Sequence, residues 1–246
     1  MNKVKLQLIL SGALFALSIL ILAGATIAYF SDFYQASSTI TSGNVSIELS
    51  QSAVKHENGD LVKDPDAPRL KGGSESTIRD YGLVYAGMSV CKDPTITNVG
   101  ENEAWVAAKV TIADGMGDLQ KIMGYGEEPG IDMTVLLADG ILGESARFGT
   151  WNGIPNVRYN NNYAIVQSPD PENDQFYFYI FFLNTLKPGE EVVLWEYMNI
   201  PSEWTTNQMR ELIELSITIQ AFGVQTSNLE SCYEAMLSAF PKHFSE

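Results

Sequence analysis

Apolar and polar residues alternate along most of the chain in short runs, which is typical of β-strands with one buried face. In the run 44–49, the side chains of Val45, Ile47 and Leu49 fall on the same face. Comparable runs cover 83–90, 103–114, 132–138, 163–168, 175–184, 191–198 and 212–224. The sequence therefore predicts at least eight strands, separated by loops rich in glycine, proline, asparagine and aspartate.

One of these runs differs from the others because it is apolar on both faces. Residues 176–183 are almost entirely aromatic or aliphatic, which favours a central strand covered on both sides. The Lys-Pro-Gly-Glu sequence at 187–190 has the residue types of a tight turn. Three segments suggest short helices, and two polar stretches that interrupt the strand pattern suggest loops. The helices are expected at 118–123, 202–211 and 228–240, and the loops at 56–80 and 140–162. The predicted class is all-β: an antiparallel, jelly-roll-like β-sandwich with short peripheral helices.

The N-terminal segment has the pattern of an export signal. After two lysines, residues 6–31 contain no charged side chain. As a helix this run would extend roughly 39 Å, more than the ~30 Å hydrocarbon core of a membrane. It ends in small residues, with Thr26 and Ala28 at positions −3 and −1 of a cut before Tyr29, and no basic cluster follows. We expect residues 1–28 to be a cleaved signal peptide, with a retained membrane anchor as the alternative.

The remaining chain, 29–246, is expected to form one domain that is secreted and lies outside the cell or on its surface. Contact with the membrane is expected only through the signal segment before cleavage. The net charge is −15 for the whole chain and −17 once residues 1–28, with their two lysines, are removed. Such a charge opposes binding to nucleic acid, which we do not expect as a partner. It also opposes self-association, so any assembly should depend on salt.

The candidate chemistry is sparse, and we expect no enzyme activity, no catalytic residue and no cofactor. The two histidines, His56 and His243, are far apart in sequence, and no His-Glu-x-x-His motif accompanies them. Acidic stretches at 64–66 and 170–174 could supply oxygen ligands to calcium, but they lack the spacing of a known calcium loop. We therefore expect no metal site.

The cysteines and tryptophans leave alternatives open. Cys91 and Cys232 could be buried thiols, or they could form a disulfide that closes a loop of about 140 residues. Trp151, Trp195 and Trp204 could form an aromatic platform for a sugar, which would make the protein a carbohydrate-binding module at the cell surface.

The junction after the apolar segment carries a resemblance to a known family. Residues 25–32 read Ala-Thr-Ile-Ala-Tyr-Phe-Ser-Asp, and a Gly-Asn-Val-Ser-Ile sequence follows at 43–47. This arrangement resembles the TasA/camelysin family, in which a Thr-x-Ala-x-Phe-x-Asp pattern ends the signal peptide. Further similarities lie at 97–100, 105–110, 186–190 and 217–225. The resemblance implies a jelly-roll domain exported to the cell surface, where several members form fibres of a biofilm matrix.

The resemblance also implies partners and a mode of assembly. A dedicated SipW-type signal peptidase would remove the signal, and the freed N-terminal segment would be donated as a strand to the next subunit. Partners would be further copies of this chain, arranged head to tail, or a related matrix protein. The candidate donor arm covers 29–49 and has its apolar residues at Tyr29, Phe30, Phe33, Tyr34, Ile40, Val45 and Ile47.

Two alternatives stay open within this resemblance. The arm could instead pair within its own subunit as the first strand. Camelysin-type relatives have also been described as metalloproteases, but this chain lacks the histidine ligands that such activity requires.

Overall fold

The computed structural model describes residues 28–32, 45–71, 79–114, 146–170, 175–206, 209, 215–226 and 229–244. Its strands are β1 (Ala28–Asp32), β2 (Ile47–Gln51), β3 (Val54–Glu57), β4 (Asp60–Lys63), β5 (Leu70–Lys71), β6 (Arg79–Val84), β7 (Ser89–Cys91), β8 (Thr95–Asn98), β9 (Ala104–Asp114), β10 (Arg147–Trp151), β11 (Ile154–Tyr159), β12 (Tyr163–Asp170), β13 (Gln175–Phe182), β14 (Glu191–Val193), β15 (Tyr197–Asn199) and β16 (Leu215–Gln225). Two short helices, α5 (Cys232–Ala239) and α6 (Pro241–Phe244), follow the last of these strands.

The first layer of the fold is a six-stranded antiparallel sheet with the order β10-β11-β12-β13-β9-β16. Its longest pairing joins β9 and β16, which stay in register from Ala104 opposite Gln225 to Asp114 opposite Leu215. The aromatic strand β13 lies between β12 and β9, so the prediction of a central strand is confirmed.

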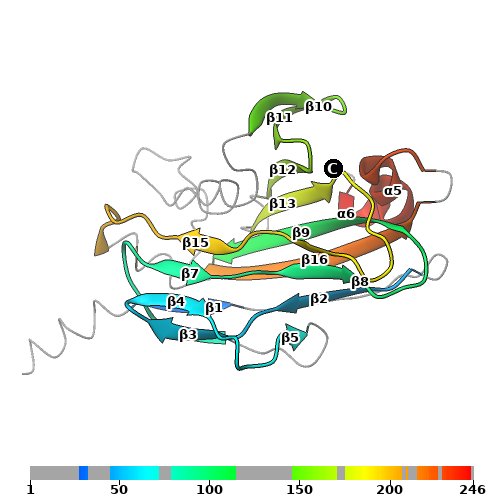
Figure 1. Cartoon of the computed structure of the whole chain (residues 1–246). Coiled ribbons are helices and arrows are strands. Elements are labelled where there is room, and N and C mark those ends of the chain that lie inside the picture. The colour runs from blue at the N-terminus through cyan, green and yellow to red at the C-terminus, as the bar shows by residue number, and fades with distance from the viewer. Residues whose placement is uncertain are drawn as a thin grey trace, which may run out of the picture.

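The second layer consists of two four-stranded sheets that lie end to end, with the orders β14-β8-β2-β5 and β15-β7-β4-β3 (Figure 1). The chain passes directly from one sheet to the other between β2 and β3, between β4 and β5, between β7 and β8, and between β14 and β15. Backbone hydrogen bonds continue across one of these breaks, from Leu194 N–H to Pro94 O at 2.8 Å and from Lys92 N–H to Glu196 O at 3.0 Å. The second layer is therefore one broken surface rather than two unrelated sheets.

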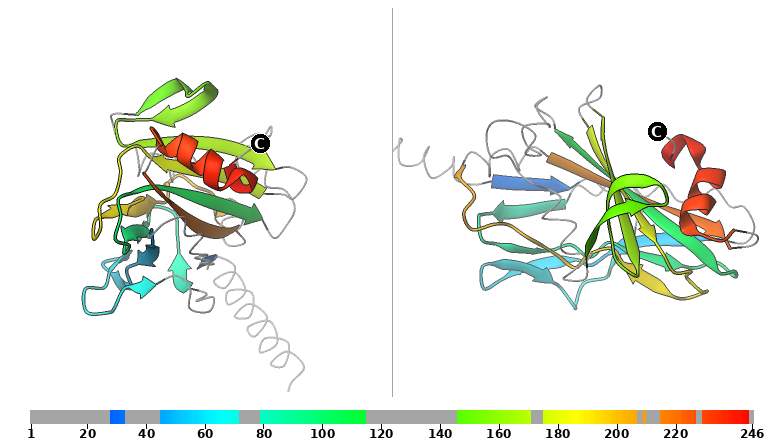
Figure 2. Two further views of the ribbon diagram at one scale, coloured as in Figure 1. Left: turned by 90° about the vertical axis from the view of Figure 1, so that its right-hand side faces the viewer. Right: turned by 90° about the horizontal axis from the view of Figure 1, so that it is seen from above.

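The hydrophobic core lies between the two layers. Buried side chains of β9, β13 and β16 in the first layer meet those of β2, β7 and β8 in the second. A second cluster lies on the opposite face of the six-stranded sheet, which α5 and α6 cover (Figure 2). Ser231 is the N-cap of α5, and its side chain accepts a hydrogen bond from the Glu234 backbone N–H at 3.3 Å. The expected all-β antiparallel sandwich with short peripheral helices is confirmed.

Two stretches that we expected to be loops contain hairpins instead. The segment 56–80 includes β4 and most of the β3–β4 hairpin, and 140–162 includes β10 and β11. Each hairpin turns at an Asn-Gly pair with positive φ angles. These are 53° and 95° at Asn58 and Gly59, and 48° and 82° at Asn152 and Gly153. An Asn-Gly pair between two short strands is a strong signal for a tight hairpin turn. In these two segments that signal outweighs the polar composition that favours loops.

Other expected elements differ at their ends. The run 83–90 is divided by a turn at Gly87, whose φ is +86°, and 191–198 is divided at the break between β14 and β15. The turn at 187–190 is confirmed, because Glu190 N–H donates to Lys187 O at 2.9 Å and Gly189 has a φ of +81°. The C-terminal helix begins at Cys232 rather than at residue 228. The predictions for 118–123 and 132–138 lie outside the described residues, as do residues 207, 208, 210 and 211 of the helix expected at 202–211. In the described part of that segment, residues 206 and 209 are helical, and Met209 N–H donates to Thr205 O at 3.0 Å.

Candidate functional site

The expected donor strand is paired within its own subunit in this structure. β1 forms an antiparallel two-stranded sheet with β6, in which Ala28 lies opposite Val84 and Tyr29 opposite Leu83. The register shifts between Tyr29 and Ser31, so the ladder is short and irregular. β1 also lies beside β16 at the edge of the six-stranded sheet. The expected cleavage point between Ala28 and Tyr29 falls at the beginning of this strand.

The remaining residues of the expected arm divide into two groups. Thr26, Phe33, Tyr34 and Ile40 lie outside the described residues, whereas Phe30 is part of β1. Val45 and Ile47 are 3% and 6% exposed and belong to the core between the layers. A Cβ atom added at Gly223 of β16 would lie 2.8 Å from the Ile47 Cγ2 and 3.3 Å from the Val45 Cγ1. This part of the expected arm therefore belongs to the body of the subunit, which shortens any exchangeable segment.

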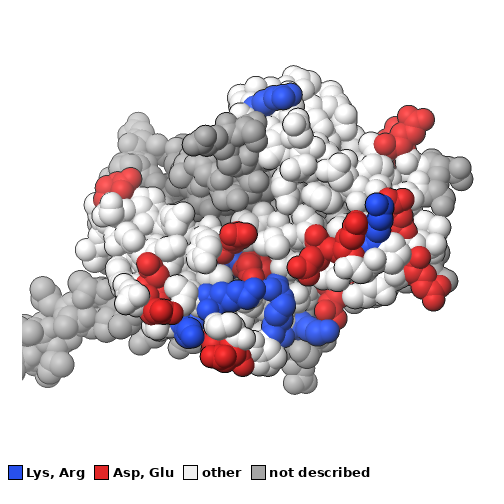
Figure 3. Space-filling view, viewed as in Figure 1, with Lys and Arg blue, Asp and Glu red and all other residues white. Residues whose placement is uncertain are grey.

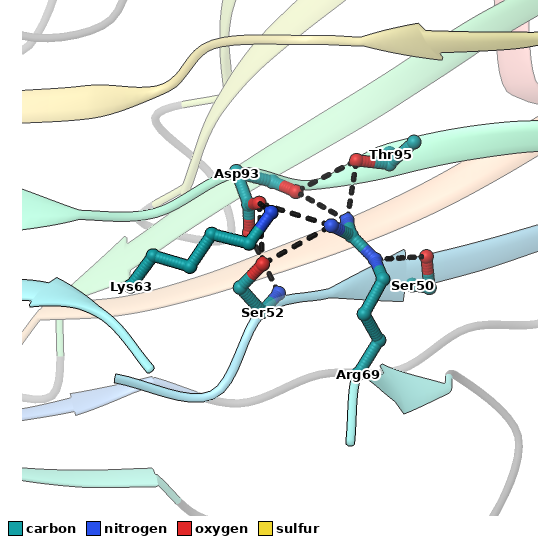
Figure 4. A network of polar contacts seen from close by, with 6 residues as sticks. All are labelled: Ser50, Ser52, Lys63, Arg69, Asp93 and Thr95. Carbon is teal, nitrogen blue, oxygen red and sulfur yellow. Dashed lines mark hydrogen bonds and ion pairs between the residues drawn. The ribbon is translucent and has the colours of Figure 1, made fainter. Parts of the chain in front are cut away.

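A polar network lies at the break in the second layer (Figure 4). We call it the Arg69–Asp93 network; it comprises Ser50, Ser52, Lys63, Arg69, Asp93 and Thr95. Arg69 donates to the Asp93 carboxylate at 3.1 Å and to the Thr95 hydroxyl at 2.6 Å. The same guanidinium donates to the hydroxyls of Ser50 and Ser52, each at 3.1 Å.

Asp93 itself is almost completely buried. Its carboxylate accepts from the Ser52 backbone N–H at 2.6 Å and from the Ser52 hydroxyl at 2.7 Å. Lys63 adds an ion pair at 3.9 Å. Because protein groups already occupy both the carboxylate and the guanidinium, we interpret this network as a structural link and not as a catalytic centre.

On the face shown in Figure 3, basic side chains over the second layer lie close to acidic ones, whereas the basic side chain near the top of the view has none of the described acidic side chains beside it. Besides the two ion pairs of Asp93, Lys55 pairs with Asp64 at 3.8 Å and Lys71 with Glu48 at 2.9 Å. The four basic residues of these ion pairs are therefore locally neutralised.

The two cysteines are thiols in this structure, and both are buried. Cys91 belongs to β7 in the second layer, whereas Cys232 begins α5 on the far side of the six-stranded sheet. A disulfide between them would have to pass through that sheet. The Cys232 Sγ lies 3.1 Å from the Val106 carbonyl oxygen, to which it donates, and burial raises the pKa of this thiol to about 12.

The three tryptophans do not form a common platform. Trp195 is 1% exposed and lies in the core between the layers. Trp151 packs on the opposite face of the six-stranded sheet, with ring centroids 5.3 Å from Phe181 and 5.4 Å from Tyr233. Trp204 packs against the core between the layers. The sugar platform that these residues suggested in the sequence is therefore not assembled.

Two cavities lined by described residues differ in their chemistry. One, of about 540 Å³, lies between β11–β13 and the C-terminal helices and has mixed polar and apolar walls, in which Tyr179, Phe181 and Tyr233 are among the aromatic residues. The other, of about 640 Å³, lies along β14 and β15 and has predominantly polar walls. We call the second cavity the β14–β15 groove. Nothing in the sequence pattern pointed to it, because its opposite wall comes from Asn162 and Tyr163 at the start of β12 and from Phe182 at the end of β13.

The histidines are not brought together. His56 lies in β3 of the second layer, whereas His243 lies in α6 and packs its ring 5.1 Å from that of Phe222. In the described part of the chain, no group of three or more His, Cys, Asp or Glu side chains is arranged to bind a metal ion. Among those same residues, no helix has both the length and the apolar character needed to cross a membrane.

The comparisons with known proteins add no relative. No family model, no curated protein and no solved structure matches this chain. The fold therefore defines the class, an antiparallel β-sandwich with a short N-terminal strand at its side.

Proposed function

We propose that this protein is a secreted structural subunit of an extracellular fibre or matrix, assembled by donation of its N-terminal strand to a neighbouring copy. The observation that carries the proposal is the β1–β6 pair. The segment that signal cleavage would place at the N-terminus is already a strand, and it is held by one short, irregular ladder. The similarity of the 25–32 junction to the TasA/camelysin family supports the same function.

Exchange of this strand is favourable on physical grounds. A two-stranded sheet is only marginally stable in water, so releasing β1 costs little. A neighbouring copy can offer the same partner, β6, and the backbone hydrogen bonds lost in one subunit are regained in the next. Because the donor strand of one copy fills the acceptor site of the next, the contact runs head to tail. It builds a filament unless the rotation between successive subunits closes a ring.

The chain has the length and the acceptor edge that this exchange requires. At about 3.3 Å per residue, the twelve residues 33–44 can span at most roughly 40 Å between β1 and the body of the subunit. β16 is an eleven-residue edge strand, and its ladder within the described residues is with β9. An incoming strand would therefore find β6 on one side and the β16 edge on the other.

Export by a SipW-type signal peptidase precedes assembly in this proposal. Cleavage after Ala28 leaves Tyr29 at the N-terminus and preserves nearly all of β1. N-terminal sequencing of the secreted protein should therefore begin at Tyr29. A sequence that begins at Met1 would show a retained anchor and would contradict release of the arm.

Strand exchange can be tested with a reversible lock. We expect a disulfide between Tyr29→Cys and Leu83→Cys, which face each other in the β1–β6 ladder, to hold the strand in its own subunit. The background carries Cys91→Ala and Cys232→Ala so that only the new thiols react. The oxidised protein should stay monomeric in electron microscopy and sedimentation, and reduction should restore fibres. Fibre growth by the fully oxidised protein would rule out donation of β1.

A truncation gives a complementary result. Deleting 29–42 should abolish fibre growth while leaving the far-ultraviolet circular dichroism of the sandwich nearly unchanged, because Val45 and Ile47 keep their core positions. Polymerisation of the truncated protein at the parental rate would contradict the proposal.

A further inference from the structure

The β14–β15 groove combines a polar surface with an unusual buried donor. Trp195 lies along this groove and is 1% exposed, and its indole N–H has no hydrogen-bond partner among the described residues. Buried polar groups in proteins nearly always have a partner, and leaving one without costs about 1–3 kcal/mol. A residue that lines a cavity and carries an unsatisfied donor is therefore a reason to look for a ligand that supplies an acceptor.

The opposite wall of the groove is held in place by local hydrogen bonds. The Asn160 side-chain oxygen accepts from the backbone N–H groups of Asn162 and Tyr163 at 2.7 and 2.8 Å. The Tyr163 hydroxyl donates to Val193 O at 3.0 Å, and its ring packs on Phe182 with centroids 5.3 Å apart. These contacts tie the first layer to β14, so the groove exists before any ligand arrives.

The Tyr163 contact also argues against an added strand in this groove. A strand that pairs along an exposed edge needs the free carbonyl groups of that edge. Tyr163 occupies the Val193 carbonyl, so the β14 edge is blocked at its last residue. The occupant must instead recognise side chains.

The remaining polar groups define the ligand chemistry. Glu191 and Glu196 are exposed carboxylates that only accept hydrogen bonds, whereas the Trp195 indole only donates. Tyr197, 40% exposed, supplies an aromatic ring in the same groove. Adjacent hydroxyl groups donate and accept at once, and the C–H face of a sugar ring packs on an aromatic ring. From this combination, we infer that the β14–β15 groove binds an uncharged oligosaccharide.

Charge determines which oligosaccharides fit. The two glutamates and the net charge of −15 repel polymers rich in uronic acid or sulfate. Uncharged oligosaccharides are not repelled in this way. This function goes beyond fibre formation, because a subunit with this groove would attach neutral matrix glycans to the fibre. Binding of a glycan in the groove does not depend on strand exchange.

The test uses the whole secreted chain, kept monomeric at low concentration, with three probes. These are a β-1,4-glucan hexasaccharide, an N-acetylglucosamine hexasaccharide and an oligogalacturonate of equal length. Binding of at least one neutral probe should shift the Trp195 indole N–H signal in ¹⁵N-labelled protein, a signal assigned by its loss in Trp195→Phe. Calorimetry should show that Tyr197→Ala weakens this binding about tenfold, equivalent to about 1.4 kcal/mol.

The matched control is Phe148→Ala, which removes an aromatic ring that is 69% exposed on β10, outside the groove. It should leave binding unchanged. Three results would overturn the inference: no shift with either neutral probe, equal losses for both variants, or tighter binding of the oligogalacturonate. Since the assay monitors monomers, its failure leaves strand donation untouched, and a failure of the disulfide-lock experiment leaves the groove untouched.

Discussion

Asp93 connects separate segments of the second layer because its carboxylate accepts hydrogen bonds from Ser52 and from Arg69. It lies between β7 and β8, and it contacts Ser52, which lies between β2 and β3. Arg69 approaches from the segment before β5 and adds a charged bond at 3.1 Å. On the side of the break that faces Ser52, hydrogen bonds to the Asp93 side chain therefore take the place of backbone hydrogen bonds between strands.

We expect Asp93→Ala to lower the free energy of unfolding by about 2–4 kcal/mol, because it leaves a buried N–H without an acceptor and Arg69 without its main counterion. Asp93→Asn, which keeps an acceptor but loses the charge, should cost less. The matched control is Glu48→Gln, which breaks the more exposed ion pair with Lys71 and should cost no more than about 1 kcal/mol. Urea denaturation of the monomer measures all three, and equal effects of Asp93→Ala and Glu48→Gln would show that the network adds no stability.

At the scale of elements, the contact between the start of β2 and the edge strand β16 limits how far the proposed exchangeable arm can extend. Gly223 has no side chain, which lets Ile47 and Val45 pack directly against the β16 backbone. The Val45–Ile47 segment is therefore part of the core of its own subunit, and the exchangeable arm lies before it.

This contact predicts that Gly223→Ala destabilises the monomer by about 1–3 kcal/mol, since the new methyl group would lie 2.8 Å from the Ile47 Cγ2. The control is Gly149→Ala in β10, where the nearest atom is the Tyr159 hydroxyl oxygen at 3.9 Å. That change should be neutral in thermal unfolding. If Gly223→Ala is neutral too, residues 45–47 are not docked on β16 in the monomer.

For the whole molecule, the excess of negative charge would set the conditions of the proposed assembly. After signal cleavage each subunit would carry a net charge of −17, and every fibre contact would bring two such subunits together. Salt shortens the range of this repulsion from about 30 Å at 0.01 M to about 8 Å at 0.15 M.

We therefore expect fibre growth to accelerate severalfold between about 0.01 and 0.15 M sodium chloride at fixed protein concentration. Light scattering follows the growth, and sucrose at equal osmolarity serves as the uncharged control. Growth that slows as salt is added would mean that attraction between opposite charges drives the contact.

Local patterns in the sequence were sufficient for the class of fold and for several strands. Alternation predicted β9 and β16, and the doubly apolar run predicted the central position of β13. A strand buried on one face has alternating apolar residues, and a strand buried on both faces has a continuous apolar run. The two Asn-Gly hairpins are also encoded locally, since they depend on residues that adopt positive φ, although the polar composition of their segments favours loops. The charge and the junction at 25–32 are likewise properties of the chain itself.

The tertiary structure decided what depends on contacts between distant segments. It placed Cys91 and Cys232 in different layers, separated Trp151 from Trp195, and assembled the Arg69–Asp93 network and the β14–β15 groove. No periodic pattern records such juxtapositions, because they follow from how the sheets pack and where their strands break. The sequence determined which faces are apolar, whereas packing determined which polar side chains meet.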